Sequence, residues 1–255
     1  VGHITLNRPK ALNALTYDMI LEIEKALISW KENTKIKLIL VDSNGDKAFC
    51  SGGDVSNLYR HGVSGNYKFG KLFWADEYRL NLLIANYPKP YVVFMQGFTM
   101  GGGVGISCHG SHRIVGDTSI IAMPECGIGL VPDVGGSFLL TRKSKELGIY
   151  LGITGSHMKA DDAIFTNFAD FFVEEKYWEE AKSKLIKTGD ATFLNKFKRE
   201  SLNSPLKKNL RLIIDLFSIN KLSLIIEEME MNPVFVHSLK KMLSASPLSV
   251  LTSYH

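Results

Sequence analysis

The chain has 255 residues, of which 45% are hydrophobic and 22% are charged, and its formal net charge is +4. This length fits one large domain or a domain with an appendage, and the composition excludes a disordered, collagen-like or coiled-coil protein. The basic residues are scattered in runs no longer than pairs such as Lys207-Lys208, so we expect no nucleic-acid partner.

Strand-like and helix-like segments alternate as far as residue 142, which predicts an α/β fold. Short apolar runs typical of strands, two of them buried on both faces, occur at residues 1–6, 36–41, 91–95 and 119–123. Helical spacing or a helix N-cap is found at residues 17–30, 67–86, after Gly53 as far as Tyr59, and after Gly103 as far as about residue 109.

From Arg142 onward the pattern becomes mostly helical, with candidate helices at residues 174–187, 190–199, 221–231 and 234–244. We therefore predict a core at residues 1–200 and a helical C-terminal segment at residues 201–255. Residues 246–249 (Ser-Pro-Leu-Ser) are typical of the start of one more helix, so we expect this segment to be incomplete.

Residues 90–112 contain no Asp, Glu, Lys or Arg and are long enough to span a bilayer. They also contain Gln96, Thr99, two histidines and six glycines, which favours a buried strand, a glycine turn and a buried helix. Three cysteines are too few for a disulfide framework, and the odd number fits a reducing compartment. We expect a soluble protein of the cytoplasm, or of the mitochondrial matrix if the source is eukaryotic, with no membrane partner.

Two glycine loops, at residues 50–54 and 100–103, each follow a buried strand. Glycine lets a backbone N–H point into a cavity without a Cβ in the way, and the second loop also begins a helix whose first amides favour negative charge. Two such amides that converge make an oxyanion hole, in which one donor contributes about 2.7–4 kcal/mol to transition-state stabilisation. Either loop alone is better explained as an ordinary close-packed turn.

Two carboxylates, Glu125 and Asp133, lie eight residues apart in a segment rich in glycine and apolar residues. Poor hydration in such a segment raises the pKa of a carboxylate towards that of a useful general base. Taken alone, two loop acids are better explained as solvated or capping residues. His109 and His112 lie in an apolar region, where hydrogen bonds in the core explain them better than metal binding does.

Four segments in a fixed order resemble the crotonase (enoyl-CoA hydratase/isomerase) superfamily: residues 6–15 (LNRPKALNAL), 47–54 (KAFCSGGD), 99–105 (TMGGGVG) and 123–136 (MPECGIGLVPDVGG). Within it, the chain is most similar to the hydrolases of 3-hydroxyisobutyryl-CoA. The resemblance implies a spiral of ββα units with a helical C-terminal region. Because family members continue past the position of His255, it also implies that this region is truncated.

The resemblance further implies roles for individual residues. The N–H groups of Gly53 and Gly102 form the hole for the thioester oxygen, Glu125 is the catalytic glutamate, and Asp133 is the second acid. The residues implied to contact the substrate or to follow its CoA moiety are Glu77, Ser51, Gly52, Asp54 and Lys10. The partner is an acyl-CoA whose CoA is part of the substrate, so no separate cofactor is expected, and a homo-oligomer stays open.

Position 105 separates the branches of the superfamily. Enoyl-CoA hydratases carry a second catalytic glutamate there, whereas this chain has Gly105. Adding water across a double bond commonly uses two carboxylates. Thioester hydrolysis needs one carboxylate to activate water, because a thiol with a pKa near 8.5 leaves without a strong acid.

The function implied is therefore hydrolysis of 3-hydroxyisobutyryl-CoA, or a similar short 3-hydroxyacyl-CoA, to the free acid and CoA in valine breakdown. Glu125 acts as a general base or as a nucleophile through a mixed anhydride, and Asp133 holds the substrate hydroxyl or orients water. Two alternatives stay open. One is an enoyl-CoA hydratase or isomerase that uses Glu125 alone, and the other is a non-catalytic acyl-CoA-binding subunit.

Overall fold

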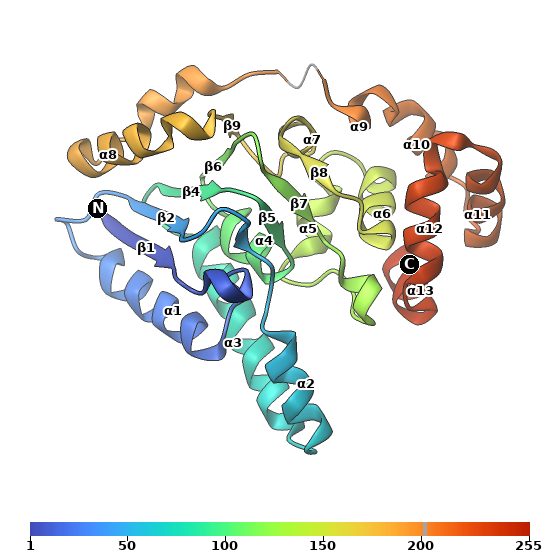
Figure 1. The fold of residues 1–255 in the computed structure, drawn as a ribbon, viewed down its shortest axis with the longest axis horizontal. Helices are drawn as coiled ribbons and strands as arrows, with labels where there is room; N and C mark the ends of the chain where they lie inside the picture. The colour runs from blue at the N-terminus through green and yellow to red at the C-terminus, as the bar shows by residue number, and fades with distance from the viewer. Residues whose placement is uncertain (201–202) are drawn as a thin grey trace.

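The structure, a computed structural model, describes residues 1–200 and 203–255. Two β-sheets form the core (Figure 1). The larger sheet is parallel throughout and contains, in spatial order, β1 (Gly2–Leu6), β2 (Ile39–Ser43), β4 (Tyr91–Met95), β6 (His112–Val115) and β9 (Phe171–Phe172). The smaller sheet contains β3 (Ala48–Cys50), β5 (Phe98–Met100), β7 (Ile120–Ala122) and β8 (Met158–Lys159), of which only β8 is antiparallel to its neighbour.

From β2 to β7, successive strands alternate between the two sheets. The pairs β2 and β3, β4 and β5, and β6 and β7 each place their first strand in the larger sheet and their second in the smaller sheet. Helices follow each pair before the chain returns to the larger sheet. This arrangement is the predicted spiral of ββα units, and it brings the carboxyl ends of β3 and β5 side by side.

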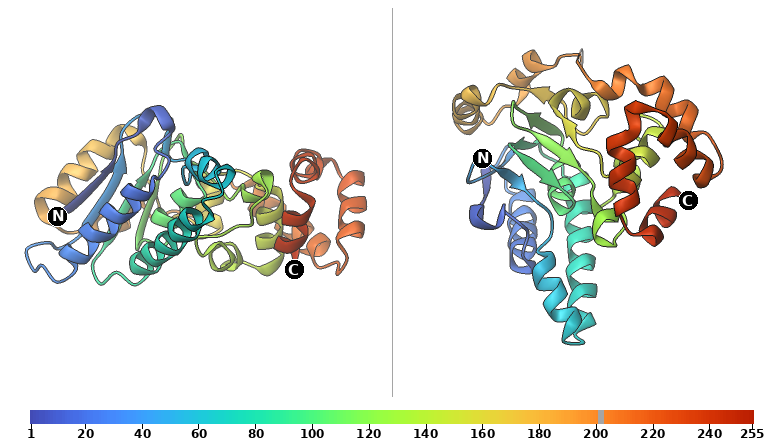
Figure 2. Two further views of the ribbon diagram at one scale, coloured as in Figure 1. Left: turned by 90° about the horizontal axis from the view of Figure 1, so that it is seen from below. Right: turned by 45° about the vertical axis from the view of Figure 1, so that its right-hand side comes forward.

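The larger sheet is covered on both faces, as the apolar run at residues 36–41 predicts (Figure 2). On one face, Leu40, Val92 and Phe94 pack with residues of α8 (Trp178–Thr188). On the other face, Val41, Val93 and Met95 pack with α1 (Tyr17–Lys31) and α3 (Tyr67–Ala85). Adjacent strand residues point to opposite faces, so a strand with no polar face must be buried on both.

The helices of the first half lie where the sequence predicts them. The hydroxyl of Thr16 accepts a hydrogen bond from the Met19 N–H and so caps α1, which matches residues 17–30. The helix after the first glycine loop is α2 (Val55–Val63), and the segment at residues 67–86 is α3. The second glycine loop leads into α4 (Gly102–Ser107). Among the described residues, no helix has both the length and the apolar character needed to cross a membrane.

The sequence pattern missed five short strands. β3 and β5 have three residues each, β6 has four, and β8 and β9 have two each, which is too few to show a period of two. Their neighbours in space, not their own sequence, determine that they are extended.

The second half is mostly helical, as predicted. Its helices are α5 (Gly136–Thr141), α6 (Lys145–Thr154), α7 (Ala160–Phe165), α8, α9 (Pro205–Lys208), α10 (Leu210–Phe217), α11 (Leu222–Met231), α12 (Val236–Ser244) and α13 (Pro247–Tyr254). α8, α11 and α12 match predicted helices, whereas the prediction at residues 190–199 corresponds to a 3-10 helix, Thr192–Phe197. The start of the predicted C-terminal segment, at residues 201 and 202, lies outside the described residues.

Candidate active site

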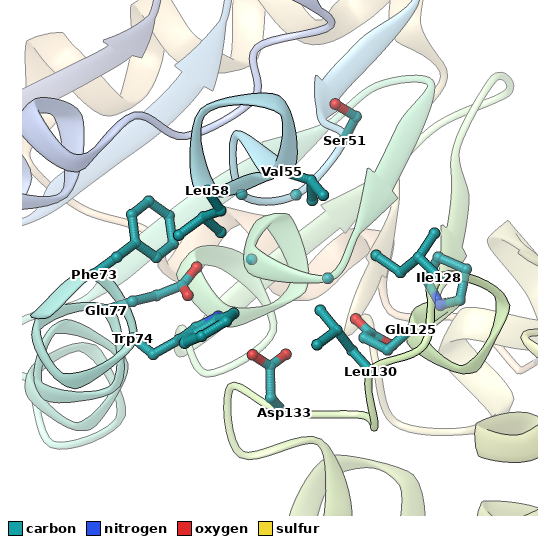
Figure 3. Close-up of a pocket in the computed structure, with 15 residues that line it drawn as sticks. Ser51, Val55, Leu58, Phe73, Trp74, Glu77, Glu125, Ile128, Leu130 and Asp133 are labelled. Carbon is teal, nitrogen blue, oxygen red and sulfur yellow. The ribbon is translucent and has the colours of Figure 1, made fainter. Parts of the chain in front are cut away.

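A cavity of about 80 Å³ lies where the two glycine loops meet α3 and the segment after β7 (Figure 3). Backbone and apolar side chains form most of its wall, and three carboxylic acids interrupt it. The lining residues are Ser51, Gly52, Gly53, Val55, Leu58, Phe73, Trp74, Glu77, Gly101, Gly102, Pro124, Glu125, Ile128, Leu130 and Asp133.

One side of the cavity presents two backbone N–H groups, those of Gly53 and Gly102. β3 and β5 pair in parallel, so the loops that follow them adjoin. A Cβ built on Gly102 would lie 3.2 Å from the Gly53 nitrogen, which shows how close the two loops come. The turns that aim these amides have positive φ values at Gly52 (+114°) and Gly101 (+51°), a conformation that glycine adopts without a steric cost.

Neither N–H has a protein acceptor among the described residues. Gly102 is the first residue of α4, and an N–H in the first turn of a helix has no partner within that helix. The loop around Gly53 is held by its neighbours instead, because Leu15 N–H donates to the Gly52 carbonyl and Asp54 N–H donates to the Leu15 carbonyl, both at 2.8 Å. The two predicted donors are therefore fixed in place and free to bind an oxygen.

The other side of the cavity carries Glu77, Glu125 and Asp133, whose carboxyl groups point towards its centre from three directions (Figure 3). Glu77 comes from α3, Glu125 begins the 3-10 helix Glu125–Ile128, and Asp133 lies in the loop before α5. Glu77 is 2% exposed and Glu125 is 4% exposed. Oε1 of Glu77 and both carboxyl oxygens of Glu125 are buried without a hydrogen-bond partner among the described residues.

Burial raises the pKa of all three acids. It raises the pKa of Glu77 to about 8, and the charges of Asp133 and Glu125 act in the same direction. It likewise raises the pKa of Glu125 to about 8, with a further contribution from Asp133. The pKa of Asp133 is raised by burial as well, although the hydrogen bond from Tyr78 opposes this shift. Carboxyl groups with pKa values near neutrality exchange protons at physiological pH, which is the property of general acids and bases.

The space beside Gly105 is already occupied. A Cβ at this position would lie 2.8 Å from both Asn81 Nδ2 and Val134 Cβ. Asn81 is 4% exposed and stands one helical turn after Glu77 on α3. A glutamate at position 105 would therefore have to displace α3 or the loop that carries Asp133, so the site is built for three carboxylic acids and not four.

The structure brings most of the predicted residues together, but not all of them. Ser51 and Gly52 line the cavity. The Asp54 side chain does not: it caps α2 by accepting from Asn57 N–H and pairs with Arg8 at 3.1 Å. Lys10 is exposed in a separate surface depression beside Pro9. The substrate contacts of Asp54 and Lys10 stay predictions.

His109 makes the hydrogen bond to a buried residue that its apolar surroundings predict, whereas His112 is half-buried and contacts the exposed Ser111 beside it. His109 Nε2 donates to the Val134 carbonyl at 2.7 Å, and His112 Nδ1 lies 2.9 Å from the Ser111 hydroxyl. No group of three or more side chains that could hold a metal ion occurs within residues 1–200 and 203–255.

Sequence reasoning missed the apolar wall and one polar partner. Val55, Leu58, Phe73 and Trp74 come from α2 and α3 and line the same cavity as the carboxyl groups. For Phe73 and Trp74 the sequence offered a signal, because both precede Glu77 by one turn of the same helix. The hydrogen bond between Tyr78 and Asp133 joins residues 55 apart in the chain, so no local sequence pattern predicts it.

The whole chain is similar in sequence to a known protein family. A family profile described as enoyl-CoA hydratase/isomerase matches residues 1–255. The chain is similar to the proteins named "3-hydroxyisobutyryl-CoA hydrolase, mitochondrial" of Danio rerio, with 43% identity over 72% of the chain and 48% of that protein. It is also similar to those of Xenopus laevis, with 38% identity over 90% of the chain and 62% of that protein, and Gallus gallus, with 36% over 98% and 68%. The chain thus spans about half to two thirds of these relatives.

Two solved structures match with a TM-score of 0.93 each. One is described as an enoyl-CoA hydratase from Rhodobacter sphaeroides 2.4.1, with 45% identity over 98% of this chain and 74% of that one. The other is described as a carnitinyl-CoA dehydratase from Mycobacterium thermoresistibile, with 36% identity over the same shares. The names of the matching sequences and of the matching structures thus describe different reactions of acyl-CoA thioesters.

Proposed function

The chain belongs to the enoyl-CoA hydratase/isomerase family, and from this premise we propose that it hydrolyses the thioester of 3-hydroxyisobutyryl-CoA or a similar short 3-hydroxyacyl-CoA. One observation carries the proposal: two unpaired backbone N–H groups share a cavity with the buried Glu77 and Glu125 and the half-buried Asp133, while Gly105 and its neighbours leave no room for a further acid. The names of the curated relatives support the choice of substrate.

The proposed reaction begins with the thioester oxygen between the N–H groups of Gly53 and Gly102. These donors stabilise the negative charge that develops on this oxygen when a nucleophile adds to the carbonyl carbon. Glu125, in its ionised form, takes a proton from the attacking water, and the new C–O bond forms as the carbonyl π electrons move to oxygen. The tetrahedral intermediate then expels CoA as a thiolate, which a thiol pKa near 8.5 makes a good leaving group.

The remaining acids bind the acyl group. In this proposal Asp133 accepts a hydrogen bond from the 3-hydroxyl group. Glu77 contacts the substrate beside Gly102, because a Cβ on Gly102 would overlap the Oε1 atom of Glu77. A direct attack by Glu125 to form a mixed anhydride is the alternative chemistry. A single turnover in ¹⁸O-labelled water distinguishes the two, because a general base puts labelled oxygen into the first product, whereas water attack on the glutamyl carbon of an anhydride leaves that product unlabelled.

A hydratase is the second candidate, favoured by the 45% identity to the R. sphaeroides protein described as an enoyl-CoA hydratase. The assay that separates the candidates follows free-thiol release from 3-hydroxyisobutyryl-CoA with a thiol-reactive dye and, in parallel, hydration of crotonyl-CoA. Rapid thiol release without hydration is the expected result. Hydration without thiol release would assign the chain to the second candidate, and binding of both compounds without turnover would indicate a non-catalytic acyl-CoA-binding protein.

A further inference from the structure

Tyr78 follows Glu77 on α3 but makes a different contact. Its hydroxyl donates a 2.8 Å hydrogen bond to Oδ2 of Asp133. The Tyr78 ring is 42% exposed and does not line the cavity, so this hydroxyl reaches the site only through Asp133. Oδ1 of Asp133 has no side-chain donor in the parts of the chain that the structure describes. Tyr78 thus holds one carboxyl oxygen, the backbone N–H of Asp133 itself also contacts the carboxyl group, and no second side chain competes with a ligand for it within the described residues.

The backbone after Asp133 is held in an unfavourable conformation. Val134 has a φ of +46° and Gly135 a φ of +77°. A β-branched residue seldom adopts a positive φ, because its side chain then clashes with the backbone, so the surroundings must impose this conformation. His109 supplies one restraint by donating to the Val134 carbonyl at 2.7 Å, and its ring fills the space that a Cβ on Gly135 would need.

From these contacts we infer that Tyr78 is a positioning residue, which sets the orientation of the Asp133 carboxylate so that its free oxygen accepts the 3-hydroxyl group of the substrate. The inference rests on the proposed function for the identity of the substrate. Without the hydrogen bond from the tyrosine hydroxyl, the Asp133 carboxylate rotates about its Cβ–Cγ bond, because the strained loop fixes only the position of the Asp133 Cα. Recognition of the hydroxyl group weakens, while binding of the CoA portion and the oxyanion donors is unchanged.

The same hydrogen bond keeps Asp133 in its accepting form. It lowers the pKa of Asp133, whereas burial raises it. The ionisable groups that face Asp133 are Tyr78 and Glu77 from α3 and Glu125 from the 3-10 helix. Removal of the tyrosine hydroxyl therefore raises the pKa of Asp133. As the pH falls, the variant protonates Asp133, and so loses recognition of a hydroxylated ligand, at a higher pH than the wild type does.

The test compares two non-hydrolysable thioether analogues of the acyl-CoA that differ only in the 3-hydroxyl group. Their dissociation constants are measured by calorimetry for the wild type and for Tyr78→Phe. Loss of a hydrogen bond to a charged group corresponds to roughly a tenfold or greater effect, so we expect at least tenfold weaker binding of the hydroxylated analogue and less than twofold change for the other. Tyr67→Phe is the matched control, because Tyr67 begins the same helix, is 71% exposed, and should change neither constant.

A double-mutant cycle shows whether Tyr78 acts through Asp133. Adding Tyr78→Phe to Asp133→Asn should change the discrimination between the analogues by less than twofold, because the group that Tyr78 orients is already altered. Equal weakening of both analogues, or additive effects in the double variant, would overturn the inference. Because binding is measured without turnover, a wild type that discriminates between the analogues but releases no thiol would refute the hydrolase proposal and leave the inference standing.

Discussion

The two sides of the cavity differ in what they are made of. The donor side consists of backbone, the N–H groups of Gly53 and Gly102, whose positions follow from the pairing of β3 with β5. The acid side consists of the side chains of Glu77, Glu125 and Asp133, which come from three separate segments. Backbone donors do not titrate and cannot be removed by a side-chain substitution, whereas each acid titrates with pH and can be replaced by its isosteric amide. Changes on the donor side should therefore act through added volume, and changes on the acid side through charge.

On the donor side, a large effect is expected from Gly102→Ala. The added Cβ would overlap Glu77 Oε1 and lie 3.2 Å from the Gly53 nitrogen, so it enters the space of the thioester oxygen. Loss of this type of donor lowers the rate by about 10²–10³, and we expect such a loss in kcat/KM for thiol release. Gly62→Ala is the control, because a Cβ there meets nothing within 4 Å. A loss of less than threefold in a folded Gly102→Ala protein would remove this amide from the mechanism.

On the acid side, Glu77→Gln should change how stability depends on pH. The pKa of Glu77 is raised to about 8 by burial, so the folded state holds this proton more firmly than the unfolded chain does. The stability that this group contributes is present below its ordinary pKa and is lost as the pH rises towards 8. Since glutamine cannot ionise, the variant should be more stable than the wild type by on the order of a few kcal/mol at pH 8.5, with the smallest difference near pH 5.

Urea unfolding at a series of pH values measures this difference. A parallel dependence on pH in both proteins would mean that Glu77 is ionised in the folded state. The matched control is Glu22→Gln on α1, where an exposed carboxylate should leave the pH dependence as it is in the wild type.

Gly105→Glu tests whether a fourth acid can be added. Its side chain must displace Asn81 or Val134, and overpacking of a filled site costs about 1–3 kcal/mol. We expect a melting temperature lowered by several degrees, no hydration of crotonyl-CoA, and reduced thiol release because Val134 adjoins Asp133. Gly62→Glu places the same side chain in open space and should leave the melting temperature within one or two degrees of the wild type. Efficient hydration by Gly105→Glu would show that position 105 alone separates the two reactions.

The smallest effect is expected from Asp133→Asn, which removes charge and preserves shape. Thiol release from 3-hydroxyisobutyryl-CoA should fall about tenfold more than release from isobutyryl-CoA, which lacks the hydroxyl group. Steady-state kinetics with both substrates gives this ratio directly. An equal loss on the two substrates would refute recognition of the hydroxyl group by Asp133 and favour a role in orienting water.

The donor side was the more predictable from sequence, because each of its residues lies within a short glycine motif after a strand. The sequence alone also indicated that Glu125 and Asp133 are poorly hydrated, and the structure confirms the burial of Glu125. Glu77 entered only through the family resemblance, since a glutamate inside a helix has no local mark of being buried. Its position depends on α3 packing against α4, an interaction between segments that are distant in the chain.

Contacts between distant segments also explain which features of the site the sequence did not predict. The hydrogen bond from Tyr78 to Asp133 and the contact between Asn81 and position 105 both join α3 to later segments. The proximity of Asp54 and Lys10 to the substrate was implied by the family resemblance and stays a prediction. In the structure the Asp54 side chain turns to cap α2, so adjacency to a glycine loop does not bring a side chain into the cavity.

The most direct test of the account is thiol release from 3-hydroxyisobutyryl-CoA by the wild type and Glu125→Gln under identical conditions, followed from pH 6 to pH 9. Because burial raises the pKa of Glu125 to about 8, wild-type kcat should rise with pH and level off above that value. Glu125→Gln should lose about 10²–10⁴-fold in kcat, with little change in KM and no such rise. A variant that keeps near-normal kcat, or the same rise with pH, would contradict the assignment of Glu125 as the base.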